Sequence, residues 1–210
     1  MDTMAVNGAV YPTLTVDPKA YRFRILSVGN DRTLNLSFFM ACGTGGYTPM
    51  ASESCPTPTV AGIPVGTEVG MVPAAPGLGL PLLWPTDGRD GGVPDPNAAG
   101  PSWIQIGTEG GFLPAPAVIP PAPINYEYSR RSVTVTNTSS HSLDLMPAER
   151  ADVIVDFSQF HGKTLILYND APAPYPAFDT RYDYYTDDPD QTGEGGAPTT
   201  TAQQAQQAQQ

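Results

Sequence analysis

The sequence predicts an all-β sandwich or barrel with long Pro- and Gly-rich connections. Three observations support this class: about eight short segments alternate apolar and polar residues, turn residues separate them, and no long amphipathic helix is evident. The chain contains 24 Pro and 21 Gly, more than a fifth of its 210 residues. Hydrophobic residues make up 40%, which is enough for one core, so we expect one domain over residues 1–170.

The first strands are expected within the first 40 residues. Asn7-Gly8 is a turn signal between two short apolar segments. The sequence YRFRILSV (21–28) alternates aromatic or aliphatic residues with arginine, and RTLNLSFF (32–39) alternates leucine or phenylalanine with polar residues. Gly, Asn and Asp separate the two segments, so they are expected to form a β-hairpin.

Residues 41–102 have a different composition, dominated by Gly, Pro, Thr and Ser, with one strand candidate at TEVGMV (67–72). A connection of this length is expected to be either functional or poorly ordered. Asp87, Asp90 and Asp95 could coordinate a hard cation such as calcium, although their spacing is not that of an EF-hand loop. A solvated acidic loop is the better account of these carboxylates.

Cys42 and Cys55 lie at the start of this segment with twelve residues between them. Two cysteines at this spacing can form a disulfide in an oxidising compartment. The alternative is two loop thiols without a role, and the sequence does not decide between these interpretations.

Further strands are predicted after residue 101. The candidates are SWIQIGTEGGFL (102–113), APAVI (115–119), RSVTVTN (131–137), SLDLM (142–146), ADVIVDF (151–157) and KTLILYN (163–169). Residues 171–210 are rich in Pro, Tyr and Asp and end in a Gln/Ala-rich tail. Such low-complexity sequence cannot bury a core, so this tail is expected to be disordered.

Charge and hydropathy exclude several partners. The chain carries 21 acidic and 10 basic residues, for a net charge of -11, which argues against binding to nucleic acid or to an anionic membrane. No apolar run of about 18 residues is present, so no transmembrane segment is predicted. The first ten residues lack the basic start and apolar stretch of a signal peptide.

Residues that could carry catalysis are few. Glu149 and Asp152 could act as an acid–base pair, but pairing with Arg150 or capping of a turn is the structural alternative. His141 and His161 are the two histidines of the chain, and neither lies in an HxH or HCH pattern. A blue copper site needs two His and a Cys, so we predict no catalytic residue and no metal ligand, and we expect both histidines at surface turns.

Three blocks resemble the middle cupredoxin domain of multicopper oxidases of the spore-coat laccase and bilirubin-oxidase type. They are VNGAVYPTLTVDPKAYRFRILSVGNDRTLNLSFF (6–39), WIQIGTEGGFLPAP (103–116) and LMPAERADVIVDFSQFHGKTLILYND (145–170). The resemblance implies a Greek-key, cupredoxin-like fold in which residues 41–102 form an insertion. Glu149 and Arg150 are expected to tie the beginning of the strand at 151–157 to nearby backbone through charge-assisted hydrogen bonds.

The resemblance also implies a function. In that family the copper ligands lie in the first and third cupredoxin domains, and the middle domain packs between them and forms part of the substrate-cleft wall. The chain is therefore expected to be the copper-free scaffold of an oxidoreductase that oxidises phenolic, pigment or metal-ion substrates while reducing O2. Copper would be the cofactor of the parent enzyme, the flanking domains the partners, and the isolated chain inactive.

Segments that match the cleft of the family include Asp31 and the three residues Ala171, Pro172 and Ala173. Members of this family are often extracytoplasmic or part of the spore coat, but we expect neither a signal peptide nor a transmembrane segment in this chain, so the sequence leaves its localisation open. Because complete members are longer, the chain is also expected to be a fragment without its closing strand. The alternative is a stand-alone β-sandwich interaction module that docks to separately encoded copper-binding domains.

Overall fold

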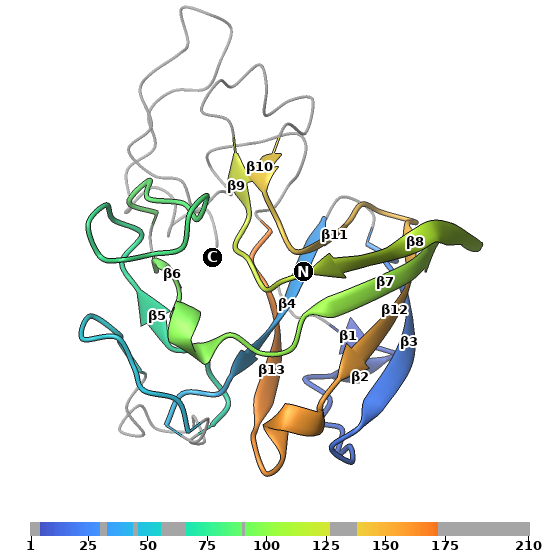
Figure 1. Ribbon diagram of the computed structural model, residues 1–210, viewed down its shortest axis with the longest axis horizontal. Helices are drawn as coiled ribbons and strands as arrows, with labels where there is room; N and C mark the ends of the chain where they lie inside the picture. The colour runs from blue at the N-terminus through green and yellow to red at the C-terminus, as the bar shows by residue number, and fades with distance from the viewer. Residues whose placement is uncertain are drawn as a thin grey trace, which may run out of the picture.

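The computed structural model describes residues 5–29, 33–43, 46–55, 66–89, 91–126 and 138–171. Two antiparallel sheets form its centre (Figure 1). The larger sheet has the strand order β3 (Ala20–Leu26), β12 (Arg150–Asp156), β7 (Trp103–Thr108) and β8 (Gly111–Ile119). The smaller sheet has the order β11 (Leu143–Leu145), β4 (Leu34–Met40) and β13 (Leu165–Asn169). The prediction of an all-β, cupredoxin-like fold is confirmed.

The remaining elements are short. Three two-stranded pairs are formed by β1 (Ala5–Val6) with β2 (Ala9–Val10), β5 (Met71–Val72) with β6 (Val93–Pro94), and β9 (Asn125–Tyr126) with β10 (Thr138–Ser140). The helices of the described residues are two 3-10 turns, η1 (Pro96–Ala98) and η2 (Ser158–Phe160), and neither could cross a membrane. The strand expected at 131–137 and the tail from residue 172 lie outside the described residues.

Strand β12 shows why alternating sequence becomes sheet here. Ala151, Val153 and Val155 are buried on one face, while the residues between them are less covered. β-branched residues fit the pleated, half-buried surface of a strand. β12 pairs with β3 along its whole length on one side and with β7 on the other.

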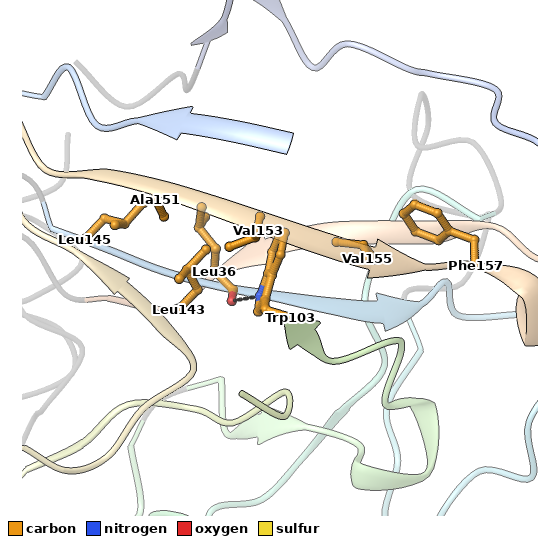
Figure 2. Packing of buried hydrophobic residues seen from close by; sticks show 8 residues of the cluster. All are labelled: Leu36, Trp103, Leu143, Leu145, Ala151, Val153, Val155 and Phe157. Carbon is orange, nitrogen blue, oxygen red and sulfur yellow. Dashed lines mark hydrogen bonds between the residues drawn. The ribbon is translucent and has the colours of Figure 1, made fainter. Parts of the chain in front are cut away.

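The main core lies between the two sheets (Figure 2). Trp103 of β7 is 1% exposed, and its indole Nε1 donates a hydrogen bond to the Leu36 carbonyl oxygen of β4 at 2.8 Å. Phe157 packs edge-to-face against Phe23 and Phe38, with centroid separations of 6.3 and 5.6 Å. Aromatic side chains from both sheets thus hold the sandwich together. The buried residues of this sheet core are Leu36, Trp103, Leu143, Leu145, Ala151, Val153, Val155 and Phe157.

The predicted hairpin between residues 21–28 and 32–39 is wrong, although both strands exist. β3 pairs with β12, whereas β4 pairs with β11 and β13 in the other sheet. The reason is burial: β4 is covered on both faces, including its polar residues Asn35 and Ser37. β3 alternates exposed and half-buried residues and lies at a sheet edge, so the two strands occupy different environments.

The described part of residues 41–102 is not a solvated loop. It packs against the face of β4 and β13 that points away from the sheet core, as Figure 1 shows for β5 and β6. The predicted strand at 67–72 shrinks to β5, and isolated bridges join this segment to β4 and its end, such as Phe39 with Ala99. The buried residues of this second core are Phe39, Val69, Val72, Ala74, Trp84, Val93 and Ala98.

Candidate functional site

The two histidines do not assemble a copper site in the described part of the chain. His141 and His161 are both exposed outside the strands, as expected, and the His141 Nδ1 atom lies 2.8 Å from the Ser142 carbonyl oxygen. Neither histidine belongs to a group of three or more converging His, Cys, Asp or Glu side chains among the described residues. The residues present therefore do not fit the His-rich ligand set that copper oxidation chemistry requires.

The predicted cleft residues are only partly described. Asp31, Pro172 and Ala173 lie outside the described residues. Ala171 is 5% exposed, and its N–H donates to the Asn169 side-chain oxygen at 3.3 Å. Assignment of these residues to a substrate cleft stays a prediction.

A buried polar network holds the segment that leads to Ala171. The Asn35 amide Nδ2 donates to the Ala122 carbonyl oxygen at 2.9 Å and to Asp170 Oδ1 at 2.5 Å. The Asn35 side-chain oxygen accepts from the Ser142 N–H at 2.7 Å. Asn35 is fully buried, so each polar atom needs such a partner. The network joins four parts of the chain, at Asn35, Ala122, Ser142 and Asp170, and the alternation of apolar and polar residues gave no signal for it.

Burial shifts the pKa of two carboxyl groups, those of Asp144 and Asp170. It raises the pKa of Asp170 to about 6, even though hydrogen bonds from Asn35 and the Ile124 N–H favour the charged form. Burial likewise raises the pKa of Asp144 to about 6, against an opposing contribution from nearby His141. Asp144 Oδ1 is buried without a hydrogen-bond partner in the described structure. Because each carboxyl group has a raised pKa in the folded chain, both make the stability depend on pH.

Asp87 and Asp95 are structural, and the prediction that they lie in a solvated acidic loop is wrong. Asp87 forms an ion pair with Arg89 at 2.8 Å, with both side chains less than 10% exposed. Asp95 is fully buried and accepts hydrogen bonds from the Met50 and Asn97 N–H groups, at 2.7 and 2.8 Å. These partners occupy the carboxylate oxygens, which leaves the calcium alternative without support; Asp90 lies outside the described residues.

The candidate acid–base residues are also structural. Glu149 accepts a hydrogen bond from the Met146 N–H at 2.7 Å, and Arg150 donates to the Ala148 carbonyl oxygen at 2.9 Å. The expectation that both residues tie the beginning of β12 to backbone is confirmed. Asp152 pairs with Arg22 of β3, which lowers the pKa of that carboxyl.

Exposed apolar side chains gather on two parts of the surface. The N-terminal arm, residues 5–19, exposes Val6, Val10, Tyr11 and Leu14. Edge strand β8 exposes Phe112 at 78% and Val118 at 69%, and its outer edge has no neighbouring strand in the described structure. Other exposed apolar side chains, such as Val28 and Leu82, lie outside these two parts of the chain.

The two cysteines lie together, and the structure links them as a disulfide with a Cα–Cα distance of 5.9 Å. Glu53 Oε1 lies 3.4 Å from Cys42 Sγ and 3.3 Å from Cys55 Sγ. The sequence interpretation missed Glu53, although its position two residues before Cys55 was available as a signal. Pairing of the thiols stays a prediction that a thiol titration would test.

The fold and its side chains thus define an all-β sandwich that lacks a recognisable active site among its described residues. The chain is 28% identical to a laccase of Bacillus subtilis over 170 residues, which is 81% of this chain and 18% of that protein. It is 29% identical to a laccase of Haloferax volcanii over the same share of this chain, and 25% identical to the multicopper oxidase LPR2 of Arabidopsis thaliana over 85% of it. No family model and no solved structure matches the chain.

These relatives are laccases and other multicopper oxidases. The chain is homologous to one part of laccases and other multicopper oxidases, and it spans less than a fifth of the length of each of these curated relatives. The resemblance drawn from the three sequence blocks is confirmed at this level.

Proposed function

We propose that this chain is the copper-free middle cupredoxin-like domain of a multicopper oxidase. The observation that carries the proposal is the match of over four-fifths of the chain to less than a fifth of each oxidase relative. Two histidines are too few for a multicopper centre, which supports a domain whose copper ligands lie elsewhere. Copper would be the cofactor of the complete enzyme and would be held by other domains.

The role of the domain would be that of a scaffold and a wall of the substrate cleft. The exposed apolar residues of the N-terminal arm and of β8 support packing against flanking first and third cupredoxin domains. Asp31 and the segment at Ala171, Pro172 and Ala173 would face the cleft. The complete enzyme would oxidise phenolic, pigment or metal-ion substrates and pass the electrons to O2.

The test is the copper content of the chain together with its oxidase activity. The chain would be purified from copper-supplemented medium, and copper per chain and oxidation of a phenolic dye would be measured. The proposal predicts near-zero copper and no turnover. Stoichiometric copper with turnover that is lost in a His141→Ala/His161→Ala variant would contradict it.

A second candidate is a stand-alone module that docks to separately encoded copper-binding domains. The outer edge of β8, an edge strand that exposes Phe112 and Val118 and pairs only with β7 in the described structure, favours a partner of some kind. Neighbouring reading frames that encode His-rich cupredoxin domains, and co-purification of their products with this chain, would support the second candidate. A single reading frame that encodes all three domains would support the first.

A further inference from the structure

A cluster of possible metal ligands lies just after β4, apart from the residues assigned to the proposed function. Cys42 Sγ, Glu53 Oε1 and Cys55 Sγ all lie within 4.8 Å of one another. Cys42 is buried and its N–H donates to the Glu68 carbonyl oxygen at 2.8 Å, so the first ligand is fixed by the backbone of the second core. No other group of three such ligands occurs among the described residues.

Two buried polar atoms beside this cluster have no partner. Glu53 Oε2 and the Tyr47 hydroxyl are buried and make no hydrogen bond in the described structure. Both groups approach Gly70, where an added Cβ would lie 2.6 Å from Glu53 Cδ and 2.7 Å from the Tyr47 hydroxyl oxygen. Buried polar atoms are nearly always paired, and a bound ion beside Glu53 and Tyr47 would provide a partner for both.

The cysteines determine when such an ion can bind. In the disulfide the sulfurs are no longer thiolates, and thiolates are the form that binds metal. A small dithiol can reduce the bond: it supplies two electrons and two protons, both cysteines become thiols, and the dithiol becomes a disulfide. A divalent ion then displaces the two thiol protons and gains two sulfur ligands and one carboxylate oxygen.

We propose that Cys42, Cys55 and Glu53 form a redox-gated site for a thiophilic divalent cation of the zinc class. Two thiolates and a carboxylate are ligands that zinc accepts, and the Tyr47 hydroxyl lies beside them. The disulfide closes the 42–55 turn in the oxidised chain and the metal closes it in the reduced chain. This site is independent of the proposed oxidase function, because it uses no residue assigned to the cleft or to copper.

The test is zinc binding by the complete chain in both redox states. Zinc affinity would be measured by competition with a chromophoric chelator, after reduction with a phosphine or without it. We expect one zinc per reduced chain and none per oxidised chain. Cobalt in place of zinc should give a sulfur-to-cobalt charge-transfer band in the reduced chain only.

Two variants keep both cysteines and separate the site from adventitious binding. Glu53→Gln removes the carboxylate ligand and should weaken zinc binding about 10–100-fold. Glu68→Gln, an exposed carboxylate of the same segment, should leave the affinity unchanged. Equal zinc affinity of the wild type and Glu53→Gln would overturn the proposal, as would equal binding by the oxidised and reduced chains. Titration of two thiols in each reduced variant confirms that the cysteines are intact.

Discussion

The sheet core and the second core lie on opposite faces of β4, and they are built in different ways. Leu36 faces the sheet core, where strands distant in sequence supply regularly alternating apolar residues. Phe39 faces the second core, where most buried residues come from one stretch of chain with two short strands. β4 therefore contributes side chains to both hydrophobic layers. Only the sheet core is built from residues that alternate regularly along strands.

The second core depends on individual polar contacts. Asp95 caps η1 and accepts a hydrogen bond from the Met50 N–H. Arg89 forms an ion pair with Asp87 and also donates to the Ile124 carbonyl oxygen at 2.9 Å. Gly92 has φ +74°, and a Cβ there would overlap the Val72 carbonyl oxygen. Irregular chain is therefore as well buried as a sheet where side chains form hydrogen bonds with its backbone N–H and C=O groups.

The largest effect is expected from removing the indole that spans the two sheets. Trp103→Ala loses a fully buried ring and the hydrogen bond to Leu36, so the free energy of unfolding should fall by about 3–5 kcal/mol. Trp84→Ala, which removes a ring of the second core, is the matched control and should cost less, because that ring does not bridge the sheets. Urea denaturation followed by circular dichroism measures both values. A larger loss for Trp84→Ala would reverse the ranking of the two cores.

The next effect tests whether polar contacts stabilise the second core. Arg89→Met leaves the Asp87 carboxylate buried without its cation, which should lower the free energy of unfolding by about 3 kcal/mol. The double variant Asp87→Asn/Arg89→Met removes the uncompensated charge and should recover part of the loss. Urea denaturation midpoints of the two variants measure this recovery. If the double variant is no more stable than Arg89→Met, the buried Asp87 carboxylate is not the cause of the loss.

The sequence was informative where burial follows a repeat. The faces of β3 and β12 were predicted correctly because Tyr21, Phe23 and Ile25 alternate with polar residues, as do the buried positions of β12. Pairing was not predictable in the same way, since β3 and β4 find partners more than a hundred residues away. Alternation specifies a strand and its face but not its neighbour.

The second core and the thiol cluster escaped prediction for a different physical reason. Asp87 and Asp95 look like solvated carboxylates in sequence, although Arg89 is close to Asp87 along the chain. Only the fold supplies the distant contacts, from Arg89 to the Ile124 carbonyl oxygen and from the Met50 N–H to Asp95. Glu53 is close to Cys55 in sequence, but only the fold brings Cys42 to the same place. The absence of a His-rich pattern, in contrast, was visible from composition alone.

A smaller effect is expected on how the free energy of unfolding depends on pH, through Asp144 of β11. The folded-state pKa of Asp144 is raised to about 6 from its ordinary value of 3.8, so the folded chain binds this proton more tightly than the unfolded chain. Its contribution to stability is therefore fully present below about pH 4 and is lost as pH rises through about 6. Asp170 contributes in the same direction.

The variant Asp144→Asn removes one of these titrating groups. The decline in the free energy of unfolding between pH 4 and 7 should become shallower by about 1–2 kcal/mol. The measurement is a series of urea denaturations at half-unit pH steps for the wild type and the variant. Parallel pH profiles would show that the Asp144 carboxyl is not perturbed by the fold.

The smallest effect is expected at the surface of the large sheet. Arg22 donates to both oxygens of Asp152 across β3 and β12, but the pair is open to solvent and therefore screened. Arg22→Gln should leave the urea midpoint unchanged within experimental error, in low and in high salt. A clear loss of stability would mean that this pair, and not the buried face of β12, determines the pairing with β3.

The most direct test of the two-core account uses the two tryptophans as separate reporters. Trp103→Phe leaves Trp84 to report on the second core, and Trp84→Phe leaves Trp103 to report on the sheet core. Because β4 is shared by both cores, we predict blue-shifted emission from each single tryptophan in the native state and coincident unfolding curves in urea. Solvent-like emission from Trp84 before any urea is added would contradict the account, since residues 41–102 would then be a loop and not a second hydrophobic layer.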